Sequence, residues 1–256
     1  MAELRRLLID PVRLETNIGI DNVLPLSRHE THYLKRVLRL RCGDAISIVD
    51  GAGHLWNATV NVEDSLRLDS PLDSPIQENI CPRPLIGLAI ALPKRGFDEF
   101  LRMSCEVGVD VVQPLSSDRC VVKVDGSDRS KRRESIICEA TEQSERLWKP
   151  ELRSIIDVRS WLMERPENAM FAIATTRLAS SIDCQVWMSG LNTNIDQIWI
   201  AIGPEGGWTK DEHLFARKNG CISVQFGESI LRTSTAAVVA TQLMVDWRRN
   251  CSRYVQ

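Results

Sequence analysis

One stretch near the carboxyl end, residues 198–237, constrains the fold more than any other part of the sequence. Residues 198–202 form an apolar run with the length of a buried strand. Three glycines within residues 203–207 then break this run, and glycine allows positive φ and a close approach of the backbone to a ligand. A capping box that starts at Thr209 predicts a helix from there to about Gly220.

A second strand, loop and helix follow within the same stretch. Residues 222–226 alternate as in a strand, and residues 227–232 form a second loop. Residues 233–245 carry no charged side chain, and their alanines give the expected helix a face of small residues. Open α/β sheets bind ligands at the carboxyl ends of neighbouring parallel strands. The two loops therefore predict one binding site.

Composition excludes several other classes of protein. The chain has 256 residues, of which 43% are hydrophobic and 26% charged, as in ordinary globular proteins. Its net charge of −2 means that any surface for nucleic acid must be local. The eight cysteines are scattered and form no Cys-x-x-Cys pair, so we expect no metal site. Since no signal segment or membrane-spanning run is present, we expect a cytoplasmic protein with reduced thiols.

The pattern of strands and helices changes once along the chain, which predicts two domains. Residues 1–72 read as a small β-rich domain. Its expected strands are residues 6–9, 45–49 and 55–60. A proline-rich linker covers residues 70–84. Strands and helices alternate from residue 85 onward, which predicts a parallel α/β sheet within residues 83–256. That alternation includes long helices at residues 97–107 and 127–147.

A basic segment lies inside the first domain. Residues 27–41 have helical spacing of apolar side chains and begin with a capping box at Ser27. Five basic residues face one acidic residue there, the most one-sided charge in the sequence. A solvated helix face and a contact with an RNA backbone both fit this pattern.

The ordered motifs of the chain resemble one known family. The glycine loop with its flanks, the second loop and the start of the last helix carry most of the likeness: Ile202–Trp208, Gly227, Ile230–Thr233 and Thr235-Ala236. Further likeness lies upstream, at Lys94, 106–108, Pro114, Arg119, 139–144, Arg146 and Pro150, and weakly at His32, 37–40 and 43–44. Together these motifs resemble the RsmE family of ribosomal RNA uridine-N3 methyltransferases, which belongs to the SPOUT superfamily.

The resemblance implies a fold, a reaction and partners. It implies a carboxyl-terminal SPOUT-type parallel sheet with a trefoil knot and a small amino-terminal PUA-like β-barrel that docks RNA. It also implies a homodimer that uses S-adenosylmethionine to methylate uridine N3 in small-subunit (16S) ribosomal RNA. The expected partner is ribosomal RNA or the small ribosomal subunit.

The two loops are the expected cofactor site. No Gly-Lys-Ser/Thr and no Gly-x-Gly-x-x-Gly accompanies them, so a P-loop and a dinucleotide fingerprint are excluded. Apolar walls from Ile202 and Leu231 suit an adenine ring. Taken together with the resemblance, the expected cofactor-binding residues are Thr175, Ile202, Gly203, Pro204, Glu205, Gly206, Gly227, Ile230, Leu231 and Ala236.

Arg232 is the expected catalytic residue. A structural arginine held by carbonyls or a carboxylate is the alternative, but the planar donor fork suits an RNA phosphate or a uracil oxygen. The family usually has glutamate after the threonine that follows, whereas this chain has Ser234. Serine can cap a helix, but it is no base at neutral pH without help. The sequence does not identify the base that removes the N3 proton.

The expected RNA contacts come from the basic segment and one helix: Arg28, Lys35, Arg36, Arg39, Gln143 and Arg146. For Gln143 and Arg146, ordinary pairing on a helix surface is an equal alternative. Two rival functions remain open at this point. One is a SPOUT ribose 2′-O-methyltransferase, and the other is a non-catalytic RNA-binding protein with the same fold.

Overall fold

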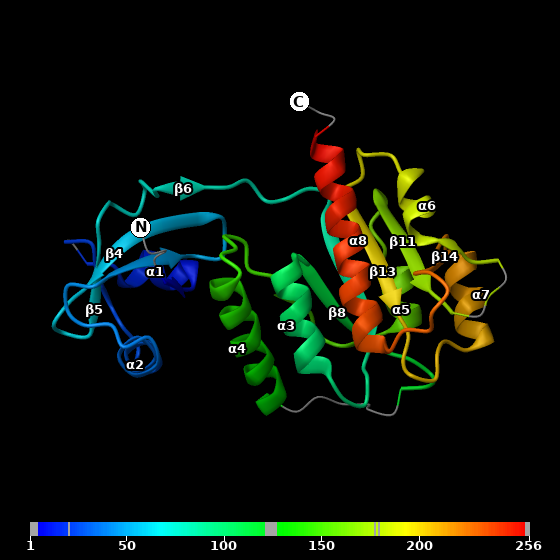
Figure 1. Ribbon diagram of the computed structural model, residues 1–256, viewed down its shortest axis with the longest axis horizontal. Helices are drawn as coiled ribbons and strands as arrows, with labels where there is room; N and C mark the ends of the chain where they lie inside the picture. The colour runs from blue at the N-terminus through cyan, green and yellow to red at the C-terminus, as the bar shows by residue number, and fades with distance from the viewer. Residues whose placement is uncertain (1–4, 20, 121–126, 177, 179, 254–256) are drawn as a thin grey trace. The chain divides into compact units, whose positions relative to one another are not determined.

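The computed structural model describes residues 5–19, 21–120, 127–176, 178 and 180–253. The chain forms two compact units (Figure 1). The first contains residues 1–81 and 141–149, and the second contains residues 82–140 and 150–256. The two continuous ranges expected from the sequence leave out the return of residues 141–149 to the first unit.

The first unit is built on a six-stranded sheet with strand order β1-β3-β4-β5-β2, in which β6 pairs with β4. Strand β1 runs parallel to β3, and the other pairs are antiparallel. The strands are β1 (Arg6–Leu8), β2 (Val23–Pro25), β3 (Ala45–Val49), β4 (His54–Val60), β5 (Ser65–Leu68) and β6 (Gln77–Glu78). The predicted β-rich unit is thus confirmed, although β2, β5 and β6 were not expected.

A short helix that sequence patterning missed follows β1. Helix α1 (Pro11–Asn17) has proline in its first turn, and the side chain of Asp10 accepts a hydrogen bond from the backbone N–H of Arg13. Asp-Pro is a good helix start, because proline lacks the N–H that a first turn leaves unpaired. The helix buries a single side chain, Leu14, so its apolar periodicity is too weak to detect.

The basic segment does not form one continuous helix. Helix α2 (Arg28–His32) begins at the predicted capping box of Ser27, and a π-helix, η1 (Tyr33–Val37), continues it. Arg39 then adopts a left-handed conformation with a φ of 58°. The helix has ended by this point, and the N–H of Leu40 donates to the carbonyl of Leu34 over 2.9 Å. The expected helix over residues 27–41 is therefore wrong at its carboxyl end.

Residues 141–149 pack against the hairpin of β3 and β4. Leu147 is buried with Val49 and Leu55. The carbonyl of Leu147 accepts a 3.0 Å hydrogen bond from the N–H of Gly53. Helix α4 (Ser127–Gln143) therefore ends before Leu147, contrary to the expectation, because Glu145 takes a φ of 59° and turns the chain toward the hairpin.

The second unit contains an all-parallel sheet with strand order β10-β8-β7-β13-β11-β14-β12, with β9 beside β8. The strands are β7 (Leu85–Ala91), β8 (Val111–Ser116), β9 (Glu151–Leu152), β10 (Ile156–Asp157), β11 (Ala169–Ala174), β12 (Ile182–Asp183), β13 (Gln197–Ile202) and β14 (Ile222–Gln225). This confirms the predicted parallel α/β sheet. The trefoil knot implied by the resemblance stays a prediction.

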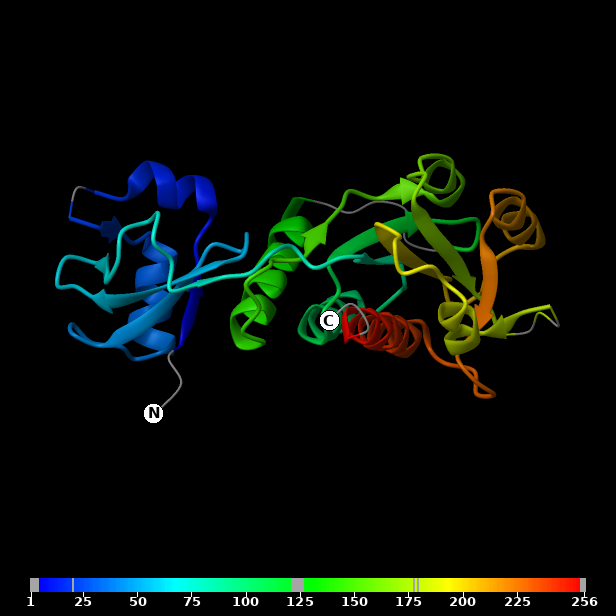
Figure 2. The same ribbon diagram turned by 90° about the horizontal axis from the view of Figure 1, so that it is seen from above.

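Helices cover both faces of this sheet (Figure 2). Helices α3, α6 and α8 lie on one face, and α5 and α7 lie on the other. Their bounds are α3 (Phe97–Val107), α5 (Val158–Met163), α6 (Cys184–Ser189), α7 (Lys210–Lys218) and α8 (Thr233–Arg253). The helices predicted after the glycine loop and after the second loop are confirmed, and α8 extends beyond the expected end at residue 245. No helix among the described residues is long and apolar enough to cross a membrane.

A candidate active site at the carboxyl ends of four strands

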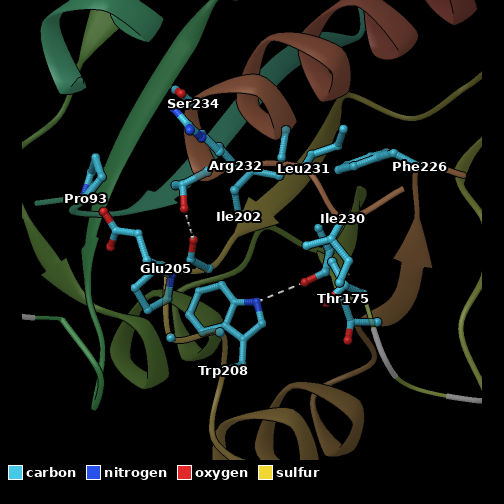
Figure 3. Close-up of a pocket in the computed structure, with 18 of the residues that line it drawn as sticks. Pro93, Thr175, Ile202, Glu205, Trp208, Phe226, Ile230, Leu231, Arg232 and Ser234 are labelled. Atoms are coloured by element: carbon cyan, nitrogen blue, oxygen red, sulfur yellow. Dashed lines mark hydrogen bonds between the residues drawn. The ribbon is translucent and has the colours of Figure 1, made fainter. Parts of the chain in front are cut away.

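A cavity of about 1060 Å³ opens in the second unit where four neighbouring parallel strands end. The loops after β7, β13, β11 and β14 all contribute to its wall, and these strands are consecutive in the sheet. Figure 3 shows the side chains that surround it. The sequence expectation that two loops make one binding site agrees with this arrangement.

The structure brings the expected cofactor and catalytic residues together. Each of them lines this one cavity: Thr175, Ile202, Gly203, Pro204, Glu205, Gly206, Gly227, Ile230, Leu231, Arg232 and Ala236. Thr175 reaches the cavity because it follows β11 directly. Ala236 reaches it from the first turn of α8.

The glycine loop, residues 203–207, is fixed on three sides. The Glu205 carboxylate accepts a 3.0 Å hydrogen bond from the backbone N–H of Lys94, in the loop after β7. The hydroxyl of Thr233 donates to the carbonyl of Gly203 over 3.1 Å, which joins the loop to the start of α8. Trp208 donates from its indole N–H to the carbonyl of Ala174 over 3.1 Å. These three hydrogen bonds hold the loop in place, and the part of Glu205 is to join it to the loop after β7.

The second loop offers unpaired backbone to the cavity. In the described part of the chain, the backbone N–H and C=O groups of residues 227–231 have no hydrogen-bond partner. Gly227 has a φ of 112°, and a Cβ added to it would meet no atom within 4 Å. Ile230 is apolar and yet 63% exposed. This loop therefore presents polar backbone groups and apolar surface to the same space.

Arg232 is the last residue of the second loop and directly precedes α8. Its side chain is exposed and has no hydrogen-bond or ion-pair partner among the described residues. Ser234 lies beside it and is half-buried (Figure 3). The alternative of a structural arginine, held by carbonyls or a carboxylate, finds no support in these contacts.

Several residues of the cavity wall were not anticipated. They come from the loops after β7 and β8, from α3 and α7, from the chain after β11, and from the end of β14 and the residue that follows it: Pro93, Arg95, Gly96, Glu99, Arg119, Thr176, Leu178, Lys210, His213, Gln225 and Phe226. Pro93, Arg95 and Gly96 could have been found from the sequence, because they directly follow a strand of the predicted parallel sheet. The carboxyl ends of such strands share one edge of the sheet.

His213 on α7 is the one wall residue with a resolved change of pKa among those named here. Burial lowers its pKa from the ordinary 6.5, and the charge of Glu212 opposes that change only in part. Its ring Nδ1 is buried and has no hydrogen-bond partner within the described residues. Desolvation disfavours the charged imidazolium, which explains the direction.

We predict that His213 makes the fold less stable in acid. Above pH 6.5 the ring is neutral in the folded and unfolded chains, and it has no effect. As the pH falls from 6.5 toward the lower folded pKa, the unfolded chain takes up a proton that the folded chain does not, so stability falls. Urea midpoints at pH 7.5 and pH 5.5 should therefore diverge more for the wild type than for His213→Gln. Equal pH dependence in the two proteins contradicts this.

The expected RNA-contact residues are not gathered at one place. Arg28, Lys35 and Arg36 line a smaller cavity of about 330 Å³ in the first unit, and Lys35 pairs there with Asp64. Arg39 is exposed outside that lining. Gln143 is exposed at the end of α4, and Arg146 lies in the turn beyond it. Within the described residues, no group of three or more His, Cys, Asp or Glu side chains could hold a metal ion.

Known proteins resemble this chain over nearly its full length. The family model of the RNA methyltransferase domain matches residues 81–245, and that of the RNA methyltransferase PUA domain matches residues 26–69. Ribosomal RNA small subunit methyltransferase E of Synechocystis is 34% identical over 92% of this chain and 75% of its own length. The protein of the same name from Rickettsia conorii is 31% identical over 84% of this chain and 85% of its own.

A solved structure has the same fold. The crystal structure of ribosomal RNA small subunit methyltransferase E from Neisseria gonorrhoeae, bound to S-adenosyl methionine, aligns with a TM-score of 0.78 and 27% identity. The alignment covers 95% of this chain and 98% of that one. With these matches and the cavity at the strand ends, the chain belongs to the ribosomal RNA small subunit methyltransferase E (RsmE) family of RNA methyltransferases.

Proposed function

We propose that this protein is an S-adenosylmethionine-dependent methyltransferase that modifies N3 of a uridine in small-subunit ribosomal RNA. The observation that carries the proposal is the cavity built by the glycine loop and the second loop, in a chain of the RsmE family. A relative of similar fold has been solved with S-adenosyl methionine bound.

The residues present fit this cofactor. An adenine ring needs apolar walls, and Ile202, Ile230 and Leu231 line the cavity. Ribose hydroxyls and the amino-acid end need hydrogen-bond partners, and the backbone groups of residues 227–231 are unpaired among the described residues. Gly227 leaves the space beside the loop open. We assign adenine binding to the apolar side chains and ribose binding to the second loop.

The protein's own contribution to the reaction is positioning and charge stabilisation. The cofactor supplies an electrophilic methyl group. Neutral uracil N3 is a poor nucleophile, so its proton must leave and the negative charge that develops on the uracil oxygens must be stabilised. Arg232 is an exposed donor at the cavity wall, and its guanidinium suits that charge. Ser234 has no carboxylate, so the base that takes the proton lies elsewhere.

The first unit is the RNA-docking part of this proposal. Phosphate contacts by exposed lysine and arginine side chains supply affinity without sequence preference. Arg28, Lys35, Arg36 and Arg39 are exposed on α2, η1 and the turn that follows. Gln143 and Arg146 are weaker candidates for the same contact. The active form is a homodimer in this proposal, and the enzyme works in the cytoplasm, where its RNA substrate is found.

One variant tests the cofactor site directly. Gly227→Val places a branched side chain into the cavity at a φ of 112°, and we expect S-adenosylmethionine to bind at least about tenfold more weakly. Gly43→Val is the matched control, because Gly43 has a φ of 90°, has open space around it and lies outside the cavity. Both variants should lose some stability through backbone strain. Calorimetry that shows the same affinity for both contradicts the site.

The reaction itself is tested with labelled S-adenosylmethionine and two substrates, naked ribosomal RNA and isolated small subunits. Nucleosides are then separated and identified by mass spectrometry. We expect label in 3-methyluridine. Label in a 2′-O-methylated nucleoside would assign the protein to ribose methylation instead. If calorimetry detects no cofactor binding at all, the non-catalytic RNA-binding alternative replaces the enzyme.

A further inference from the structure

A residue of the loop after β8 contacts the glycine loop, which follows β13, although β8 and β13 are not adjacent in the sheet. In the sheet, β7 lies between β8 and β13. The side chain of Arg119 nevertheless reaches the glycine loop, and its Nη1 donates to the carbonyl of Gly206 over 2.6 Å. The same nitrogen donates to the carbonyl of Trp208 over 3.4 Å. One arginine therefore donates to two backbone carbonyls, one in the glycine loop and one directly after it.

Arg119 also limits the space beside this loop. A Cβ added to Gly206 would lie 3.3 Å from Cδ of Arg119, which is tighter than an ordinary contact. The arginine stem therefore packs closely against backbone at Gly206. Glycine-rich loops have the largest conformational entropy to lose, and this loop needs support from outside itself to keep one conformation.

The residue before Arg119 is fixed in turn by the start of α7. The backbone N–H of Asp118 donates to Oε1 of Glu212 over 2.9 Å. The Oε2 atom of this buried glutamate accepts from the N–H of Thr209 over 2.7 Å. Thr209 also donates from its hydroxyl to Asp118 over 3.2 Å. The capping box of α7 thus serves a second purpose, which is to hold the loop that carries Arg119.

Asp118 is anchored on its other side as well. Its two carboxylate oxygens accept hydrogen bonds of 3.0 and 2.8 Å from Arg159. This bond holds the pKa of the Asp118 carboxyl below its ordinary range. Asp118 is therefore held by residues of α5 and by the start of α7. The next residue, Arg119, bonds the carbonyls of Gly206 and Trp208.

We propose that Arg119 is a positioning residue, which keeps the glycine loop in the conformation that binds the cofactor. The proposal rests on the proposed function for the identity of that cofactor. Arg119 acts through the backbone of Gly206 and Trp208. Loss of its side chain removes both of these hydrogen bonds and loosens the loop at Gly206, while the bonds made by Glu205, Trp208 and Thr233 remain. The cofactor then has to order the loop when it binds, which lowers its affinity.

The test compares Arg119→Ala, Arg119→Lys and the wild type without any ligand first. Amide hydrogen exchange over residues 203–209 should be at least about threefold faster in Arg119→Ala, because hydrogen bonds that fix the loop are lost. Arg119→Lys keeps one donor and should lie between the two. Arg217→Ala is the control, since Arg217 is an exposed arginine of α7 outside the cavity wall. It should exchange as the wild type does.

Calorimetry with S-adenosylmethionine follows on the same proteins. We expect about tenfold weaker binding for Arg119→Ala and partial recovery for Arg119→Lys. Weaker binding with unchanged exchange in the free protein would overturn the proposal, because Arg119 would then contact the ligand directly. Faster exchange over the whole second unit would also overturn it, as that indicates a general loss of fold. If the wild type binds no S-adenosylmethionine, the proposed function fails, while the exchange comparison still decides the role of Arg119.

Discussion

Gly87→Ala should destabilise the protein by about 3 kcal/mol or more, because overpacking against a rigid aromatic core is costly. Gly87 lies in β7 opposite Trp199 of β13. A Cβ at this position would lie 2.1 Å from Cδ2 of the Trp199 indole. Trp199 is 1% exposed and packs with Phe171 and Trp161, so the ring has no room to move. Urea denaturation of the two proteins measures the difference.

A double-mutant cycle with Trp199→Leu tests the stated cause. Trp199→Leu alone is destabilising because it empties part of the core. In that background the added methyl group of Gly87→Ala fills vacated space and should cost less than in the wild type. Gly190→Ala is the matched control, since its Cβ would make only an ordinary 3.6 Å contact. Equal costs for Gly87→Ala in both backgrounds would refute the clash.

The fold of the second unit was predictable because its strands are buried on both faces. Such strands appear in the sequence as short continuous apolar runs, and the run at residues 198–202 that predicted β13 is an example. Strand β12 and helix α6 escaped detection, because each is short and their exposed residues interrupt the apolar pattern. Where a helix ends was hardest to predict. Helix α4 stops at a contact with a hairpin that is distant in the sequence.

The candidate site was predictable in part. The residues found from the sequence are those in the two loops, where glycines and a family resemblance mark them. The residues missed lie outside the two loops, such as Arg95 after β7, Arg119 after β8 and His213 on α7. Only the order of strands in the sheet brings these loops to one cavity. That order depends on pairing between strands far apart in the chain, which local periodicity does not encode.

Within the proposed function, Arg232→Ala should slow methyl transfer by at least about 100-fold, which corresponds to about 2.7 kcal/mol of lost transition-state stabilisation. The affinity for S-adenosylmethionine should stay within about twofold of the wild type, because the side chain is assigned to the developing uracil charge. Arg232→Lys keeps the charge but loses the planar fork, and should recover only part of the rate. Single-turnover transfer of labelled methyl groups to small subunits measures the rate.

Two further measurements separate catalysis from folding and docking. The side chain of Arg232 is exposed and has no partner among the described residues, so Arg232→Ala should unfold at the same urea concentration as the wild type. Arg217→Ala removes another exposed arginine of the same unit, outside the cavity wall, and should keep the full single-turnover rate. If Arg232→Ala instead weakens RNA binding and leaves the rate at saturating RNA unchanged, Arg232 holds a phosphate. Stabilisation of the uracil charge would then have to come from another donor at the cavity wall.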